Sequence, residues 1–315
     1  MIYIVLFVVS IVLTYMIKAY ALKRSVMDIP NERSSHTVPT PRGGGAAIIM
    51  VFYMGLFYFR ENIDAELFYA LLCGLPVALI GLLDDIFTLS SKIRFLVQSV
   101  SAGMALYFLG GVTSIEFILF ELQGWWVNMI AFFAIVWLTN LYNFLDGIDG
   151  YAGSEAVTVG LGLFLLFQNP LGLVIVAAAL GFLLFNWHQA SIFMGDIGST
   201  TLGFVFAVFV FSDTGNGSIY VWLVLLSLFW FDATLTLVRR YLNGERISQA
   251  HKKHGYQRLV QSGWAHDKVV WTALLYNLLF LGLLYYVESG WIVFVLSILS
   301  LVGIARFIDS RKAFV

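Results

Sequence analysis

Charged residues are scarce in this sequence: Asp, Glu, Lys and Arg make up only 12% of its 315 residues. Soluble domains carry roughly a quarter of their residues as these four types, so this chain cannot cover a globule with polar surface. Apolar residues make up 60% of the chain, and its mean hydropathy is +0.87. These values exclude soluble, disordered and nucleic-acid-binding proteins and predict a polytopic membrane protein.

Cysteine is almost absent as well. The single Cys73 excludes an intrachain disulfide and a metal cluster built on cysteine. The apolar segment 2–17 has no basic region before it and no small-residue cleavage site after it, so we interpret it as an uncleaved first span rather than a signal peptide. The net charge of −1 gives no overall attraction for polyanions, and only the positions of the few charges are informative.

A helix needs about 20 mostly apolar residues to cross the hydrocarbon core of a membrane. Segments that reach or approach this length predict an all-α polytopic membrane protein with about 11 spans in a single domain, 1–315. The predicted spans are 2–21, 44–60, 66–83, 93–110, 125–142, 152–168, 171–188, 198–213, 219–239, 269–287 and 290–307. A small hairpin outside the membrane is expected around 110–124.

The basic residues predict the orientation. With the N-terminus outside, seventeen of the eighteen Lys and Arg residues fall in the inner segments or at the helix ends beside them, and only Arg60 does not. The positive-inside rule therefore predicts a periplasmic N-terminus and a cytoplasmic C-terminus.

Five aspartates stand at inner helix ends or in short inner loops: Asp84, Asp85, Asp146, Asp149 and Asp196. Carboxylates at membrane depth are costly unless they bind an ion or line a wet cavity. Adjacent carboxylates repel each other unless a cation intervenes, and Mg²⁺ prefers carboxylate oxygen. Each group also has an ordinary structural interpretation. Asp84 and Asp85 could be solvated loop residues, and Asp196 could be an N-cap. A polar helix end is the alternative for Asn143, Asp146 and Asp149.

Two inner loops offer groups that bind anions. The first contains His36 and Arg42 followed by three glycines, which let backbone amides approach a phosphate. The second contains His251, His254 and Arg258, and an Arg can bind phosphate bidentately. A rigid turn and a cluster that binds lipid headgroups are the rival interpretations. We interpret His188 and His266 as interfacial residues.

Together these groups are typical of phosphoryl or pyrophosphate chemistry with Mg²⁺. Neither a Walker lysine loop nor a dinucleotide fingerprint is present. Because the predicted site opens inward at the depth of the headgroups, we expect one substrate to be a lipid phosphate and the other a soluble cytoplasmic compound.

Five blocks in fixed order resemble the polyprenyl-phosphate N-acetylhexosamine-1-phosphate transferases of bacterial glycosyltransferase family 4, relatives of the phospho-N-acetylmuramoyl-pentapeptide translocase. The blocks lie over residues 28 to 258 and read PNERSSH with PTPRGGG, GLLDD, NFLDGIDG, FMGDIGS and HKKHGYQR. The resemblance implies transfer of a sugar 1-phosphate from a UDP-N-acetylhexosamine to undecaprenyl phosphate, with release of UMP, at the cytoplasmic face of the bacterial inner membrane.

The resemblance also implies roles for individual residues. Asp84 and Asp85 are the implied catalytic acids, and Asp196 and Asp149 the implied ligands of Mg²⁺, with Mn²⁺ as the alternative ion. The implied substrate-binding residues are His36, Arg42, Asn143, Asp146, Asn186, Phe193, His251, His254 and Arg258. Phe193 would stack on uracil.

Two departures bear on the donor. His36 stands where the translocase carries a diphosphate-binding lysine, and two lysines separate His251 from His254 where the translocase has consecutive histidines. This spacing indicates a plain aminosugar donor, and with it the sequence resembles the branch of the family that starts O-antigen synthesis. The sequence leaves open which aminosugar is used and the oligomeric state, a homodimer included.

The sequence leaves more than one reaction path and more than one class of function open. Either the lipid phosphate attacks the β-phosphorus directly, which we favour because an ionised phosphate needs little activation, or an aspartate first forms an acyl phosphate. A membrane prenyltransferase would also use aspartates and Mg²⁺ with a polyprenyl substrate. A transporter would place its carboxylates near mid-span, whereas these cluster at one face.

Overall fold

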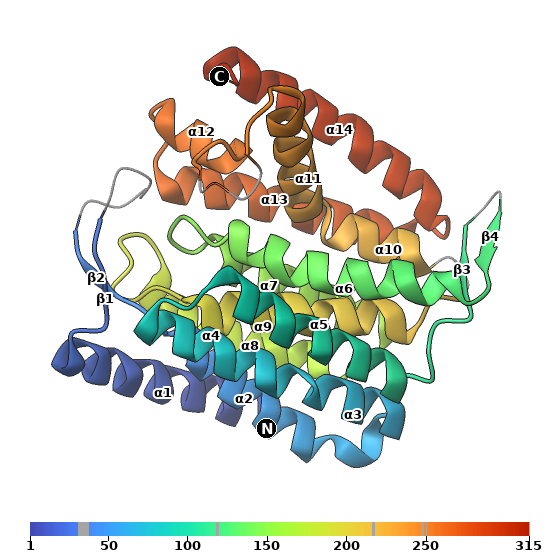
Figure 1. The fold of residues 1–315 in the computed structure, drawn as a ribbon, viewed down its shortest axis with the longest axis horizontal. Coiled ribbons are helices and arrows are strands. Elements are labelled where there is room, and N and C mark those ends of the chain that lie inside the picture. Colours follow the sequence, from blue (N-terminus) through green and yellow to red (C-terminus); the bar gives the residue numbers. More distant parts are fainter. Residues whose placement is uncertain (31–37, 118–119, 216–217, 247–248, 250, 315) are drawn as a thin grey trace.

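The computed structural model describes residues 1–30, 38–117, 120–215, 218–246, 249 and 251–314. Helices dominate this part of the chain (Figure 1), because a helix pairs its own backbone groups where no water can do so. They are α1 (Ile2–Arg24), α2 (Gly45–Tyr58), the 3₁₀ turn η1 (Arg60–Asn62), α3 (Ala65–Leu72), α4 (Gly74–Phe87), α5 (Ser91–Phe108), α6 (Trp126–Phe144), α7 (Tyr151–Phe167), α8 (Leu171–Asn186), α9 (Asp196–Ser212), α10 (Ser218–Leu225), α11 (Ser227–Leu242), α12 (Gly255–Gln261), α13 (His266–Tyr286) and α14 (Gly290–Arg311).

Two short antiparallel strand pairs complete the regular structure. Strand β1 (Met27–Asp28) pairs with β2 (Thr40–Pro41) beside the end of α1. Strand β3 (Ser114–Glu116) pairs with β4 (Glu121–Gln123) at the other end of the molecule. The second pair confirms the hairpin expected around 110–124.

The helices support the prediction of an all-α polytopic membrane protein. Among the described residues, five continuous stretches are long and apolar enough to cross a membrane, namely α1, Ala65–Phe87, α6, α13 and α14. Helices α2, α7, α8 and α9 are apolar but have only 14 to 17 residues. Each of the eleven predicted segments coincides with a helix or a helix pair, whereas the number of spans and their orientation stay predictions.

The predicted segment 219–239 is not one straight helix. It breaks at Leu226 into α10 and α11, which are bent by 75° relative to each other. In Figure 1, α11 rises steeply out of the direction that α10 follows. The bend carries Arg239 and Arg240, in the last turn of α11, away from the main bundle.

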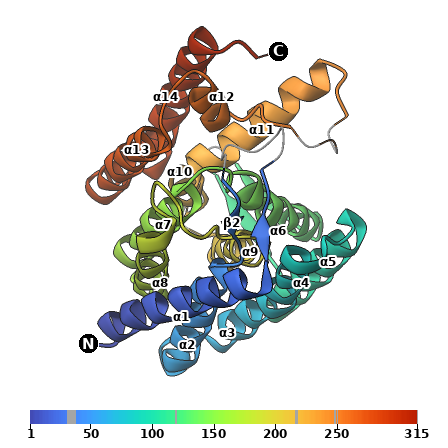
Figure 2. The same ribbon diagram turned by 90° about the vertical axis from the view of Figure 1, so that its left-hand side faces the viewer.

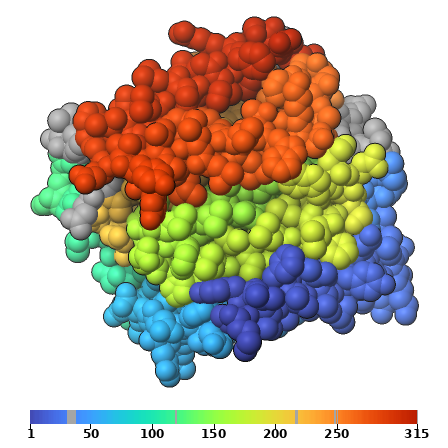
Figure 3. All heavy atoms as spheres, turned by 180° about the vertical axis from the view of Figure 1, so that it is seen from behind, coloured from blue at the N-terminus to red at the C-terminus, as the bar shows by residue number. Residues whose placement is uncertain are grey.

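Helix α9 forms the centre of the bundle. Every residue from Ile197 to Phe211 is buried, as expected for a helix that is apolar on all sides. Helices α2, α4 and α6 pack against it, and Figure 2 shows it enclosed by its neighbours. On the back face, α13 and α14 lie above α7 and α8, which lie above α1 (Figure 3). A rigid, central helix therefore fixes the position of its first residue, Asp196.

Candidate active site

The loops after α1, α6 and α8 meet at the end of the bundle that faces the viewer in Figure 2. A pocket between them, here called the inner pocket, is lined by Asp28, Arg42, Asp85, Asn143, Asp146, Gly147, Ile148, Asp149, Asn186, Phe193, Gly195, Asp196, Gln257 and His266. A second hollow, the side pocket, is lined by residues 38–41 and 188–191 and shares Asp149, Phe193 and His266 with the inner pocket. The two pockets are therefore adjacent.

Asp85 fixes the beginning of α9. It is 2% exposed, and its two carboxylate oxygens accept the backbone N–H groups of Asp196 (2.9 Å) and Ile197 (3.2 Å). Unpaired N–H groups at a helix N-terminus favour a carboxylate. Gly195 permits this contact, because a Cβ there would lie 2.5 Å from the Asp85 Oδ2 atom. Both oxygens of Asp85 are thus already engaged by the backbone.

Arg94 joins two of the predicted acids. Its Nη1 atom lies 2.7 Å from Asp84 Oδ2 and 2.7 Å from Asp196 Oδ2. The other oxygen of Asp84 accepts the N–H of Leu89, while Asn143 donates to Asp196 Oδ1 (3.0 Å) and to Ser199. The guanidinium therefore occupies the position between two carboxylates where a cation is needed.

Asp146 differs from its neighbours. It lines the inner pocket, and its carboxyl makes no hydrogen bond or ion pair with any described residue, whereas its backbone N–H donates to the carbonyl of Asn143. Burial, together with the charges of Asp196, Asp85 and Asp149, raises the pKa of Asp146 to about 8. The next residue must be glycine, because a Cβ on Gly147 would lie 2.1 Å from the Tyr256 hydroxyl. A free carboxyl is thus held in the most acidic part of the site.

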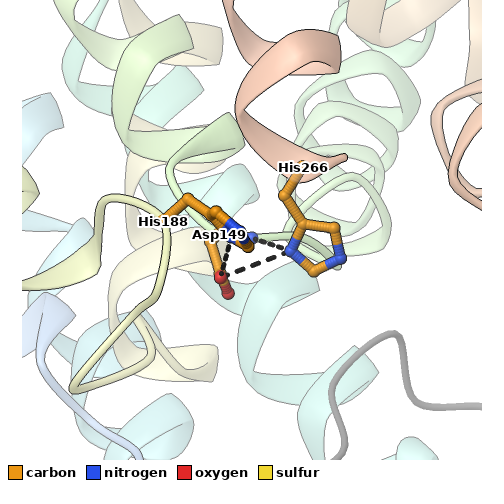
Figure 4. Close-up of side chains that lie close together, drawn as sticks. All are labelled: Asp149, His188 and His266. Carbon is orange, nitrogen blue, oxygen red and sulfur yellow. Dashed lines mark hydrogen bonds and ion pairs between the residues drawn. The ribbon is translucent and has the colours of Figure 1, made fainter. Parts of the chain in front are cut away.

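Asp149 contacts two histidines (Figure 4). Its Oδ2 atom lies 3.1 Å from His188 Nδ1 and 3.3 Å from His266 Nδ1, and it also accepts the N–H of Ala190 at 3.2 Å. Burial opposes ionisation of this carboxyl, but the hydrogen bonds from His266, Ala190 and His188 hold its pKa below the usual value. The charge of Asp149 is therefore compensated locally.

The glycine-rich loop pairs with the loop that precedes α9. The N–H groups of Gly44 and Gly45 donate to the carbonyls of Phe193 and Met194, at 2.9 and 2.8 Å. A Cβ on Gly45 would lie 2.4 Å from the Cα atom of Gly198, so only glycine allows this approach. Two of the loop's amides are consequently satisfied by the backbone. Arg42 lines the inner pocket, and its Nε atom is buried without a partner in the described part of the chain.

The other predicted binding residues divide into two groups. Asn186 accepts the N–H of Gly150 and donates to the carbonyl of Ile192, so it braces two loops of the site, and Phe193 lines both pockets. His36 lies outside the described residues.

The basic block 251–258 lies apart from the two pockets, except for Gln257. His254 is buried, and its Nδ1 atom lies 3.8 Å from Asp232 of α11. The rings of His251 and His254 have centroids 4.9 Å apart and are tilted by 38°. Burial and the neighbouring His254 lower the pKa of His251 to about 4. Arg258 donates to Asp309 of α14 at 2.7 Å and lines an apolar cavity between α11 and α14. These three side chains thus contact protein groups, although His254 Nδ1 and Arg258 Nε are buried without a hydrogen-bond partner in the described part of the chain.

Five charged or polar residues of the site are missing from the predicted set: Asp28, Arg94, His188, Gln257 and His266. His188 and His266 were interpreted as interfacial, yet both contact Asp149. The partners are 39 and 117 residues apart in sequence, so spacing along the chain carried no signal. For Arg94, its position one turn into the helix after the Asp84-Asp85 pair was the available signal.

The donor set suits a hard divalent cation. Asp85, Asp146, Asp149 and Asp196 line one pocket, and of these Asp146 retains free oxygens within the described structure. Oxygen-rich sites of this kind favour Mg²⁺ over ions that prefer nitrogen or sulfur ligands. The residues present therefore fit a magnesium ion.

Comparisons with known proteins identify the family of the chain. The model of the family described as glycosyl transferase family 4 matches residues 67–213. The chain is 31% identical over 301 residues to the probable undecaprenyl-phosphate N-acetylglucosaminyl 1-phosphate transferase of Bacillus subtilis, covering 88% of this chain and 82% of that protein.

Two further relatives are more distant. The undecaprenyl-phosphate α-N-acetylglucosaminyl 1-phosphate transferase of Thermotoga maritima is 28% identical over 89% of each chain. The phospho-N-acetylmuramoyl-pentapeptide-transferase of Kosmotoga olearia is 27% identical over 76% of this chain and 82% of its own length. The extent of these matches shows that the chain belongs to glycosyl transferase family 4 and is a phosphoglycosyltransferase.

Proposed function

We propose that the protein transfers an N-acetylhexosamine 1-phosphate from a UDP-sugar to undecaprenyl phosphate, releasing UMP and forming an undecaprenyl-diphospho-sugar. The observation that carries this proposal is the inner pocket, where five carboxylates line one cavity beside Arg42 and the beginning of α9, namely those of Asp28, Asp85, Asp146, Asp149 and Asp196. The names of the relatives from Bacillus subtilis and Thermotoga maritima support a sugar 1-phosphate transfer to a polyprenyl phosphate.

The proposed reaction forms one bond and breaks one. An oxygen of the lipid phosphate attacks the β-phosphorus of the UDP-sugar, and the bond from that phosphorus to the bridging oxygen breaks, so that UMP leaves with the electron pair. Mg²⁺, when bound, neutralises the diphosphate charge. Asp196 and Asp146 are the proposed ligands, because Asp196 sits at the fixed end of α9 and Asp146 has free oxygens.

The contacts of the paired aspartates favour direct attack. Both oxygens of Asp85 accept backbone N–H groups, and those of Asp84 are engaged by Leu89 and Arg94. A carboxylate whose oxygens are all engaged is a poor nucleophile. We therefore assign Asp85 a positioning role and expect no UMP release without the lipid acceptor; a stoichiometric burst without lipid would contradict direct attack.

Donor binding is proposed to involve Phe193 and Arg42. Phe193 lines both pockets and is proposed to stack on the uracil ring. The Nε–H of Arg42, which has no partner among the described residues, is proposed to donate to a phosphate oxygen. The concentration of Lys and Arg at this end supports a cytoplasmic site in the bacterial plasma membrane. We assign the reaction to the first membrane step of O-antigen or related polysaccharide synthesis.

The test uses purified protein in detergent with undecaprenyl phosphate, Mg²⁺ and a panel of UDP-N-acetylhexosamines, with UMP release and lipid mass as readouts. Asp196→Asn should lower turnover by at least about 100-fold, as loss of a charge-stabilising group at the reacting phosphates does. Asp213→Asn, at the opposite end of the same helix, is the matched control and should retain activity. Release of pyrophosphate from a prenyl diphosphate in place of UMP would refute the proposal.

A further inference from the structure

The Asp149, His188 and His266 side chains have the composition of a metal site that differs from the acidic centre around Asp196. They come from three separate elements: the loop after α6, the loop after α8 and the first residue of α13. Figure 4 shows them converging, and each offers one ligand atom, all three atoms lying within 4.8 Å of one another. The cluster stands where the two pockets meet, since Asp149 and His266 line both.

Two of the three separations between the ligand atoms match a tetrahedral ion, and the third, between the two histidine nitrogens, is within 4.8 Å. With metal–ligand bonds of about 2.0–2.1 Å, two ligands of a tetrahedral Zn²⁺ lie about 3.3 Å apart. Here the Asp149 Oδ2 atom is 3.1 Å from His188 Nδ1 and 3.3 Å from His266 Nδ1. A carboxylate oxygen and two imidazole nitrogens at these distances need protons or a cation between them.

The surroundings hold these ligands in place and leave one side open. The Asp149 and His266 side chains are 9% and 10% exposed, and the N–H of Ala190 fixes the shared oxygen. His188 is 35% exposed and lines the side pocket, which gives an ion a route of entry. Three protein ligands with an open fourth position are typical of zinc sites that also bind water or a substrate oxygen.

The donor set decides the class of ion. Imidazole nitrogen favours Zn²⁺ and neighbouring first-row ions, whereas Mg²⁺ favours carboxylate, carbonyl and water oxygens. We propose that Asp149, His188 and His266 bind a Zn²⁺-type divalent cation, separate from the magnesium ion proposed at Asp196. This inference does not depend on which sugar or lipid the protein uses.

The first experiment measures binding directly. Chelator-treated protein in excess Mg²⁺ is titrated with Zn²⁺ by calorimetry, and we expect one ion per chain. Replacing either histidine by alanine should weaken Zn²⁺ binding by more than about tenfold, and His188→Ala with His266→Ala should abolish it. His251→Ala, which changes a histidine that contacts another histidine outside the pockets, is the matched control and should leave Zn²⁺ binding unchanged.

A second measurement uses the unmutated protein, so that it holds even if a variant fails to fold. X-ray absorption at the zinc edge should show two imidazole nitrogens and few oxygen ligands around the ion. The proposal is overturned if Zn²⁺ does not saturate at one ion per chain, if Mg²⁺ displaces it at equal concentration, if the absorption spectrum lacks imidazole, or if His251→Ala alone removes binding.

Discussion

Asp85→Asn provides a sharp test of how the site is built, because the substitution keeps the shape of the side chain and changes only its hydrogen bonding and its charge. The carboxylate accepts two backbone N–H groups at the beginning of α9. An asparagine has one acceptor oxygen, and its NH₂ group would face a second donor. One buried N–H would lose its partner, and the remaining bond would lose its charge.

The magnitude follows from these contacts. A hydrogen bond to a charged group contributes about 1.5–3 kcal/mol, and a buried unsatisfied donor costs about 1–3 kcal/mol. Because Asp85 is only 2% exposed, solvent does not screen the loss. We expect the free energy of unfolding to fall by about 2–4 kcal/mol. Displacing Asp196 by about 1 Å should also lower turnover by about 100-fold.

The assay compares Asp85→Asn with Asp213→Asn, which lies at the other end of α9. Thermal unfolding in detergent, the affinity for UMP and the turnover number are measured on both variants. A positioning role predicts that Asp85→Asn loses stability and turnover together. If turnover fell to background while stability and UMP affinity stayed at the level of the unmutated protein, Asp85 would act on the substrate itself, and our interpretation of its contacts would be refuted.

Two further predictions concern the metal and the basic block. Because the pKa of Asp146 is raised to about 8, this carboxyl is mostly protonated at pH 7; Mg²⁺ affinity should rise as the pH increases through 8, with proton release on binding, and Asp146→Asn should remove both effects in calorimetry. Asp309→Asn should lower the free energy of unfolding by about 1–2 kcal/mol, because this partly exposed carboxylate pairs with Arg239 and the buried Arg258. The substitution should leave the KM for the UDP-sugar unchanged, and a selective rise in KM would indicate that Arg258 reaches the donor.

Hydropathy predicted where the helices lie because the membrane requires apolar side chains along each segment that crosses it. It could not predict the break at Leu226, where the surrounding residues of 219–226 are apolar and neither glycine nor proline marks the bend. The bend depends on tertiary packing, in which α10 contacts α13 and α14 while α11 contacts α6 and α14. A pattern that reports only lipid exposure carries no information about such a change of direction.

The candidate site was predictable to the extent that its residues share one property, a charge at the inner end of an apolar helix. That property brought Asp85, Asp146 and Asp196 into one hypothesis, and the structure places all three around the inner pocket. It did not distinguish a basic side chain that faces the site from one that forms an ion pair elsewhere in the chain. Arg94 bridges two site acids, whereas Arg258 pairs with a carboxylate 51 residues further along the chain.

The same contrast between local charge and long-range packing applies to the histidines. The block 251–258 was assigned to the site because it gathers basic residues in one loop, yet His254 packs against Asp232. His188 and His266 stand alone in sequence, and only the packing of α13 against α7 brings His266 to the loop that carries Asp149. Local density of charge therefore indicates where a chain meets the membrane surface, whereas the side chains that enter a pocket are selected by long-range packing. In this fold that packing sets an acidic centre at the beginning of α9 beside a mixed carboxylate–imidazole cluster, and the two differ in the ions they favour.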